Sequence, residues 1–88
     1  RVDRAVKESK TYFTQALDLY DKGDLDGAAY FLAEGNAIVD AYDFGSATRT
    51  EVIGASFGKT GMERLEYMTF ILLKNGITPT RATLEAAR

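Results

Sequence analysis

The feature that most constrains this chain is a pair of long helical patterns separated by one short turn. Apolar or small residues recur at three- and four-residue spacing through residues 2–22, which is typical of one buried helical face. A second helical pattern covers residues 25–44. The apolar face of the first pattern comprises Val2, Ala5, Val6, Ser9, Tyr12, Phe13, Ala16, Leu19 and Tyr20.

The turn between the two patterns has the sequence Asp21-Lys22-Gly23-Asp24. Gly23 is expected to take the left-handed conformation that ends a helix at low cost, and Asp24 is a natural N-cap for the next helix. Lys22 stands four residues after Asp18, so the two side chains are expected to pair on the helix surface. A short turn of this kind makes its two helices antiparallel neighbours.

The second pattern is apolar over two adjacent faces and must therefore contact two partners. Its main face comprises Leu25, Ala28, Ala29, Leu32, Val39 and Tyr42, and Phe31, Gly35 and Ile38 extend it sideways. Gly35 costs about 1 kcal/mol relative to Ala inside a helix, so we expect a neighbouring helix to approach closely there. Asn36 and Asp40 lie one turn apart beside the apolar face. They are the best candidates for a polar pair at a helix interface, and simple surface exposure is the alternative.

The composition excludes several classes of chemistry. The chain has no Cys and no His, which removes thiol chemistry, zinc and iron–sulfur ligation and every mechanism that requires imidazole. The net charge is −2 with both signs interspersed, so no basic patch indicates binding to nucleic acid or to an anionic membrane. No apolar run approaches the roughly 20 residues that span a bilayer. We therefore expect a cytoplasmic protein with no cofactor and no metal.

Residues 46–60 permit two interpretations. Thr48 and Glu51 fit a capping box, which favours a short helix. The crowding of glycines in this segment favours an irregular loop instead. Gly45, just before the segment, is expected to be the C-cap of the second helix.

The remainder of the chain predicts two more helices. Thr60 and Glu63 fit a second capping box, and apolar residues at helical spacing then predict a helix over residues 61–75. Pro79 at a first helical position predicts a last helix over residues 79–88. Together the patterns predict one all-α domain over residues 1–88, an antiparallel (up-and-down) bundle of three to four helices.

Two places permit a binding function. Gly58-Lys59-Thr60 resembles the end of a phosphate-binding loop, but the first glycine of that motif is displaced by one residue, at Gly54. Weak anion binding at the start of the following helix remains an alternative to a plain loop. Asp21, Asp24 and Asp26 are able to hold a divalent ion weakly, but they lack the final Glu of a calcium loop, and capping and solvation explain them more simply.

The hairpin resembles an archaeal family of small helical-bundle proteins that is known only as a domain of unknown function (family 357). The resemblance lies in Leu19-Tyr20-Asp21-Lys22-Gly23-Asp24 followed by Ala28, and in Val39-Asp40-Ala41 ending near Gly45. Asn36 and Ala37 stand where the family pattern has His and Gly. The resemblance implies a helix before the hairpin, whereas the segment that looks like it, starting at Met62, comes afterwards. We therefore hypothesise a circularly permuted order, in which residues 80–88 and 2–20 form one continuous helix; a bundle in the written order is the alternative.

The sequence thus predicts a non-enzymatic structural or protein-interaction module. Self-association into a homo-oligomer, or binding to a protein partner, is expected because the second and third helical patterns carry more apolar surface than one small bundle hides. The alternative function is a weak phosphate or nucleotide binder acting through Gly58, Lys59 and Thr60. The expected structural residues are Lys22, Gly23, Asp24, Gly35 and Asp40.

Overall fold

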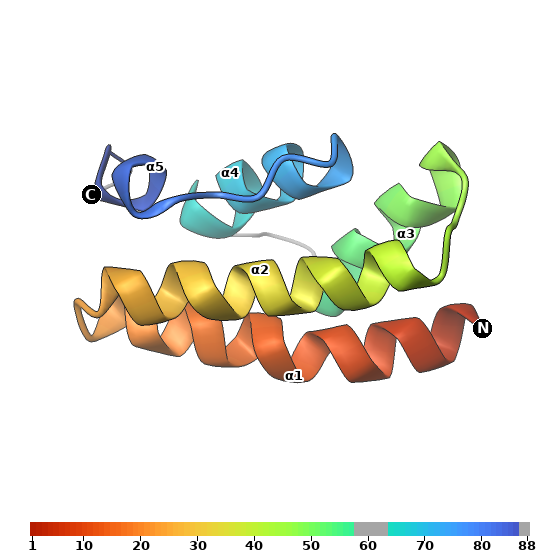
Figure 1. Ribbon diagram of the computed structural model, residues 1–88, viewed down its shortest axis with the longest axis horizontal. Helices are drawn as coiled ribbons and strands as arrows, with labels where there is room; N and C mark the ends of the chain where they lie inside the picture. The colour runs from red at the N-terminus through yellow and green to blue at the C-terminus, as the bar shows by residue number, and fades with distance from the viewer. Residues whose placement is uncertain (58–63, 87–88) are drawn as a thin grey trace.

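The computed structural model describes residues 1–57 and 64–86, apart from the side chains of residues 64–68. This part of the chain contains no strand and five α-helices, which are α1 (Val2–Asp21), α2 (Leu25–Ala41), α3 (Ser46–Phe57), α4 (Arg64–Lys74) and α5 (Arg81–Ala86). The predicted all-α class is confirmed. Helices α1 and α2 form a long hairpin, and the shorter helices α3, α4 and α5 lie on one side of it (Figure 1).

The turn of the hairpin has the predicted geometry. Gly23 has a φ of 86°, its N–H donates to the carbonyl of Tyr20, and the N–H of Asp24 donates to the carbonyl of Leu19. These two bonds define a Schellman motif, which satisfies carbonyls that the end of a helix leaves free. The Asp24 carboxylate then accepts the N–H of Gly27 at 2.9 Å and so caps α2. Both predicted capping roles are confirmed.

The predicted end of α2 is wrong. The helix ends at Ala41 and not at residue 44, because Asp43 adopts a left-handed conformation with a φ of 54°. Asp is one of the few side chains that tolerate this region. Gly45 is therefore not a C-cap. Its carbonyl instead accepts the N–H of Arg49 at 2.8 Å, which is the first helical hydrogen bond of α3.

Of the two interpretations of residues 46–60, the helical one describes Ser46–Phe57. The capping box proposed at Thr48 and Glu51 is wrong, because the helix begins two residues before Thr48, which places both residues inside it. Helix α3 packs mainly on α1, α4 packs on α3, and α5 packs on α2. All five helices contribute to the core, and its buried hydrophobic members among the described side chains are Ala5, Phe13, Ala16, Leu25, Ala28, Leu32, Val39, Val52, Ile53, Phe57, Leu73 and Leu84.

Phe13 is the central side chain of this core. Its ring is fully buried and stacks on the ring of Phe57 from α3, with centroids 4.9 Å apart. Its other neighbour is Gly35 in α2, where an added Cβ would lie only 2.6 Å from the Phe13 ring. The neighbouring helix α1 therefore meets Gly35 through the Phe13 ring, which fills the space that the missing side chain leaves. The predicted close approach of the two helices themselves stays a prediction.

Small polar residues join α1 and α3 next to this ring. The hydroxyls of Ser9 and Ser56 lie 2.8 Å apart and are both buried. Each hydroxyl also lies 2.7 Å from the carbonyl four residues earlier in its own helix. Since a hydroxyl carries one proton, one serine donates to its own carbonyl and accepts the proton of the other serine. Because both hydroxyls are satisfied, the two helices approach closely there without leaving a buried polar group unpaired.

The end of α4 repeats the turn of the hairpin. Gly76 has a φ of 77°, its N–H donates to Leu73, and the N–H of Ile77 donates to Leu72. This second Schellman motif ends the helix at Lys74, one residue before the predicted end. The capping box proposed at Thr60 and Glu63 lies outside the described residues.

The predicted start of α5 is wrong by two residues. The helix begins at Arg81, and the hydroxyl of Thr80 accepts the N–H of Thr83 at 3.3 Å, as an N-cap does. Pro79 is buried just before this cap and is therefore not the first helical residue. Leu84 anchors α5 in the core, and Arg81 pairs with Asp26 of α2 at 2.7 Å.

Helix α5 and the start of α1 lie at opposite ends of the hairpin (Figure 1). The ion pair to Asp26 holds α5 beside the Gly23 turn, whereas Arg1 bonds to Tyr42, just past the other end of α2. Within one chain, α5 therefore does not continue into α1 as one long helix. The permuted order of segments relative to the archaeal family stays a prediction.

Candidate functional site

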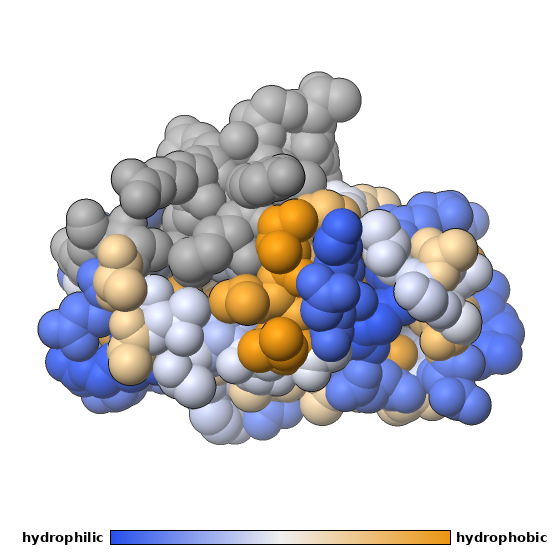
Figure 2. Space-filling model, turned by 90° about the horizontal axis from the view of Figure 1, so that it is seen from above, coloured by the Kyte–Doolittle hydropathy of each residue, from blue (hydrophilic) through white to orange (hydrophobic). Residues whose placement is uncertain are grey.

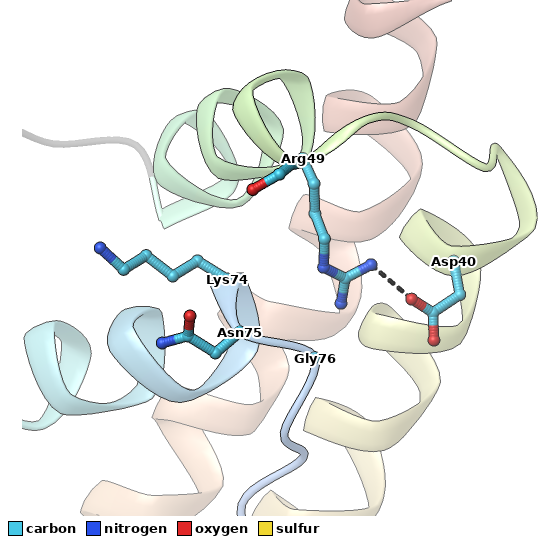
Figure 3. A pocket seen from close by; sticks show the side chains of 6 residues that line it. Asp40, Arg49, Lys74, Asn75 and Gly76 are labelled. Carbon is cyan, nitrogen blue, oxygen red and sulfur yellow. Dashed lines mark hydrogen bonds and ion pairs between the residues drawn. The ribbon is translucent and has the colours of Figure 1, made fainter.

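The largest set of converging polar groups surrounds Arg49 on α3. Its guanidinium donates through one terminal nitrogen to Asp40, through the other to Asn36, and through Nε to the carbonyl of Leu73 at 3.1 Å. Only 13% of the side chain is exposed. Because Leu73 lies in the last turn of α4, the cation also meets the negative end of that helix dipole. One side chain of α3 thus ties the ends of α2 and α4 together (Figure 3).

Asn36 extends this junction to the segment that connects α4 and α5. It is 5% exposed, accepts from Arg49 through its amide oxygen, and donates through its amide nitrogen to Thr78 at 3.0 Å. Both ends of the buried amide are therefore satisfied. We call the group of Asn36, Asp40, Arg49 and Thr78 the polar junction.

Asn36 and Asp40 lie at a helix interface as expected, but each pairs with Arg49 instead of with the other. The structure brings both residues to the same guanidinium, and no hydrogen bond between the two of them is found. Arg49 was not predicted from the sequence as a functional residue. Its partners lie 9, 13 and 24 residues away, and one of them is a backbone carbonyl, so no local spacing signals the contact.

An open pocket of about 430 Å³ lies against the polar junction. It is lined by Asp40, Ser46, Arg49, Lys74, Asn75 and Gly76. The Arg49 side chain points toward Asp40, whereas the Lys74 chain points away from both (Figure 3). Lys74 places its ammonium 5.6 Å from the centre of the Phe70 ring, and the Asn75 amide donates to a carbonyl of its own helix. Four of the six lining residues, Asp40, Arg49, Lys74 and Asn75, thus have side chains that are engaged by the protein itself.

A group of three aromatic residues lies at the edge of the hairpin. Tyr12 of α1 and Phe31 of α2 have ring centroids 6.1 Å apart, and the Tyr30 ring meets Phe31 edge-to-face at 5.3 Å. Tyr30 is 59% exposed, and the hydrogen bond between its hydroxyl and the Glu34 carboxylate raises the Tyr30 pKa. We call Tyr12, Tyr30 and Phe31 the aromatic surface. Its rings gain from mutual packing, and Tyr30 is the exposed member, while Tyr12 and Phe31 are partly buried.

A second aromatic group lies where α2 gives way to α3. The rings of Tyr42 and Phe44 stack with centroids 5.3 Å apart, and the Arg1 guanidinium carbon lies 5.6 and 5.4 Å from their centres. The Tyr42 hydroxyl donates to Glu8 at 2.7 Å. This bond lowers the pKa of the Glu8 carboxyl, to which the hydrogen bond and the positive charge of Arg4 also contribute. The same bond raises the pKa of the Tyr42 hydroxyl.

The face formed by the shorter helices also carries apolar side chains. They gather in one central group that is bordered on one side by a strongly hydrophilic surface (Figure 2). In the described part of this region Ile77 is 54% exposed, while Ile71 and Leu72 are partly buried. Among the described residues, Tyr30 and Ile77 are the two large hydrophobic side chains that are mostly exposed.

The acidic residues at the hairpin turn have structural roles. Asp24 caps α2, Asp26 pairs with Arg81, and Asp18 pairs with Lys22 at 3.0 Å. Among the side chains that the structure describes, those of residues 1–57 and 69–86, no group of three or more acidic side chains is arranged to hold a metal ion. The proposed phosphate-binding residues Gly58, Lys59 and Thr60 lie outside the described part of the chain.

Comparison with family models, with curated proteins and with solved structures gives no match. None of the helices in the described segments combines the length and the apolar character needed to cross a membrane.

Proposed function

We propose that this chain is a non-enzymatic interaction module that binds a second copy of itself through the aromatic surface. The observation that carries the proposal is the 59% exposure of Tyr30, whose ring lies against Phe31, which in turn packs against Tyr12. Aromatic side chains bury a large area at a low cost in conformational entropy, and they are enriched at the centres of protein interfaces. A rigid hairpin that presents three of them is suited to docking.

Several further features belong to this proposal. The absence of His and Cys from the sequence removes the commonest general base and the thiol nucleophile, which favours a binding role over catalysis. We take the helices to form one antiparallel bundle that acts as a rigid support for the aromatic surface. Membership of the archaeal family of unknown function and a cytoplasmic location are parts of the same proposal.

The two exposed hydrophobic side chains provide a matched experiment. Tyr30→Ser and Ile77→Ser each remove one exposed apolar side chain, on α2 and beyond the end of α4 respectively. We expect the unmodified chain to self-associate in light scattering, Tyr30→Ser to shift it to monomer, and Ile77→Ser to leave it associated. A strict monomer at every concentration would reject self-association. Dissociation by Ile77→Ser alone would show that the interface lies elsewhere.

A further inference from the structure

The connection between α2 and α3 builds an aromatic pair from two residues that are nearly adjacent in sequence. Tyr42 follows the last residue of α2, and the left-handed Asp43, with a φ of 54°, reverses the chain before Phe44. The reversal allows the two rings to stack almost in parallel, at an interplanar angle of 5°. Both rings are partly buried and pack against the core, so the pair is held in place by the fold.

This pair already holds one guanidinium, that of Arg1. The guanidinium carbon lies within 5.6 Å of the centre of each ring, which is the range of cation–π attraction. The same group donates a hydrogen bond to the backbone carbonyl of Tyr42. The Glu8 carboxylate, bonded to the Tyr42 hydroxyl at 2.7 Å, adds a negative charge beside the rings. Two π faces, a carbonyl acceptor and a nearby carboxylate are together the chemistry that recognises arginine.

The side chain of Arg1 is not needed for the helix that it precedes. The backbone carbonyl of Arg1 accepts the N–H of Ala5 at 2.9 Å, and this bond starts α1 whatever the side chain does. Arg1 itself is exposed. Its guanidinium is therefore able to leave the rings while the fold stays intact.

We propose that Tyr42 and Phe44 form a recognition site for an arginine side chain of a partner polypeptide, and that Arg1 occupies this site until the partner displaces it. Arginine is favoured over lysine because its planar guanidinium stacks on a ring while it donates to a carbonyl in the same plane. This inference takes one assumption from the interaction role proposed above, namely that the partner is a polypeptide. It concerns a surface other than Tyr12, Tyr30 and Phe31.

The test uses three short peptides, Ac-Gly-Arg-Gly-NH2, its lysine analogue and its citrulline analogue. Citrulline keeps the shape of arginine but carries no charge. Binding is followed by NMR through the ring protons of Tyr42 and Phe44. We expect the arginine peptide to bind weakly to the unmodified chain and about fivefold more tightly to Arg1→Ala, because a competitor that fills the site about four-fifths of the time lowers the apparent affinity by that factor.

Two further variants separate recognition of arginine from other effects. Phe44→Leu keeps an apolar side chain but removes one π face, so it is expected to lose most of the binding while circular dichroism shows an unchanged helical fold. Arg81→Ala removes an exposed arginine at the far end of the hairpin and is expected to leave the affinity as it was. Equal binding of the citrulline peptide, equal affinity of Arg1→Ala and the unmodified chain, or no binding at all would each overturn the proposal. These outcomes do not depend on the oligomeric state, so failure of self-association is distinguishable from failure of this site.

Discussion

The two ends of α3 are held in different ways. At its C-terminal end, Phe57 stacks on Phe13 in a dry contact that also depends on the missing side chain of Gly35. At its N-terminal end, Arg49 reaches three oxygen atoms on two other helices. The first contact stabilises through buried area and tolerates small shifts of atoms, whereas the second depends on direction and leaves buried acceptors unpaired when it fails. The comparison predicts that changes at the two ends will differ in size and in which part of the chain they loosen.

The largest effect is expected at the apolar end. Phe13→Ala removes a fully buried ring at the meeting point of α1, α2 and α3, and such truncations cost about 3–5 kcal/mol. Chemical denaturation measures the loss, and Tyr12→Ala at the neighbouring half-buried position is the control, with a smaller expected cost. Equal losses for the two variants would show that the Phe13 contact is not the centre of the core.

At the polar end, Arg49→Lys keeps the charge but is unable to reach all three acceptors. We expect a loss of about 1–3 kcal/mol, because the buried oxygen of Asn36 and the carbonyl of Leu73 lose their donor. Hydrogen exchange should quicken first in α4 and α5, since the junction attaches this part of the chain to α2. Arg81→Lys, at an exposed ion pair, should change stability by less than about 1 kcal/mol. Uniform loosening of all five helices by Arg49→Lys would remove the distinction between the two ends of α3.

The contrast between the two ends also explains what the sequence predicted well. Gly23 acts through its own backbone, the Asp24 side chain caps the helix that follows it, and Gly35 contacts the nearest helix. Helical periodicity and capping preferences were therefore sufficient to assign them. The predicted C-cap at Gly45 failed because Asp43 is also able to adopt the left-handed conformation, and the local sequence does not decide between the two.

The polar junction was out of reach for a different reason. Arg49 acquires its role only when three helices converge, and its partners are defined by the packing of the fold. Pro79 shows a milder form of the same limit. Proline is compatible both with the first helical position and with the position before an N-cap. Because the hydroxyl of Thr80 caps α5, Pro79 takes the position before the N-cap.

A pair of helical glycines tests the close contact at Phe13 from the other side. In Gly35→Ala the new Cβ would lie 2.6 Å from the Phe13 ring, so we expect a net loss of about 1–2 kcal/mol despite the better helix propensity. In Gly54→Ala the nearest neighbour, Phe70, would lie at an ordinary 3.5 Å, so we expect a gain approaching 1 kcal/mol. Denaturation curves of the two variants should move in opposite directions. A gain at both positions would mean that the ring of Phe13 yields without cost.

Removing a buried polar group that makes no hydrogen bond is expected to stabilise the fold, in contrast to removing the bonds of Arg49. The hydroxyl of Thr69 in α4 is fully buried and has no hydrogen-bond partner. Thr69→Val replaces it by a methyl group of similar size, so we expect a gain in stability of about 1 kcal/mol. Thr14→Val, an exposed position on α1, is the control and should change stability by less than about 0.5 kcal/mol. A loss on Thr69→Val would indicate that the hydroxyl finds a partner, such as a buried water.

The smallest effect is expected from the exposed hydrogen bond between Tyr42 and Glu8. Here the quantity to compare is the Glu8 pKa with and without the Tyr42 hydroxyl. The Tyr42 hydroxyl is the main cause of the lowered pKa of Glu8, ahead of the contribution of Arg4, so Tyr42→Phe should raise this pKa toward its ordinary value of 4.5. A group with a lowered pKa in the fold stabilises it above the unfolded pKa, and this contribution is lost as the pH falls through the folded pKa. Stability should therefore fall less steeply below about pH 4.5 in Tyr42→Phe than in the unmodified chain. An NMR titration of the Glu8 carboxyl carbon measures the shift directly.

The control is Tyr30→Phe, which removes a hydroxyl bonded to Glu34 and should leave the Glu8 titration unchanged. If Tyr42→Phe also left the Glu8 pKa unchanged, the lowering of that pKa would be assigned to Arg4 instead.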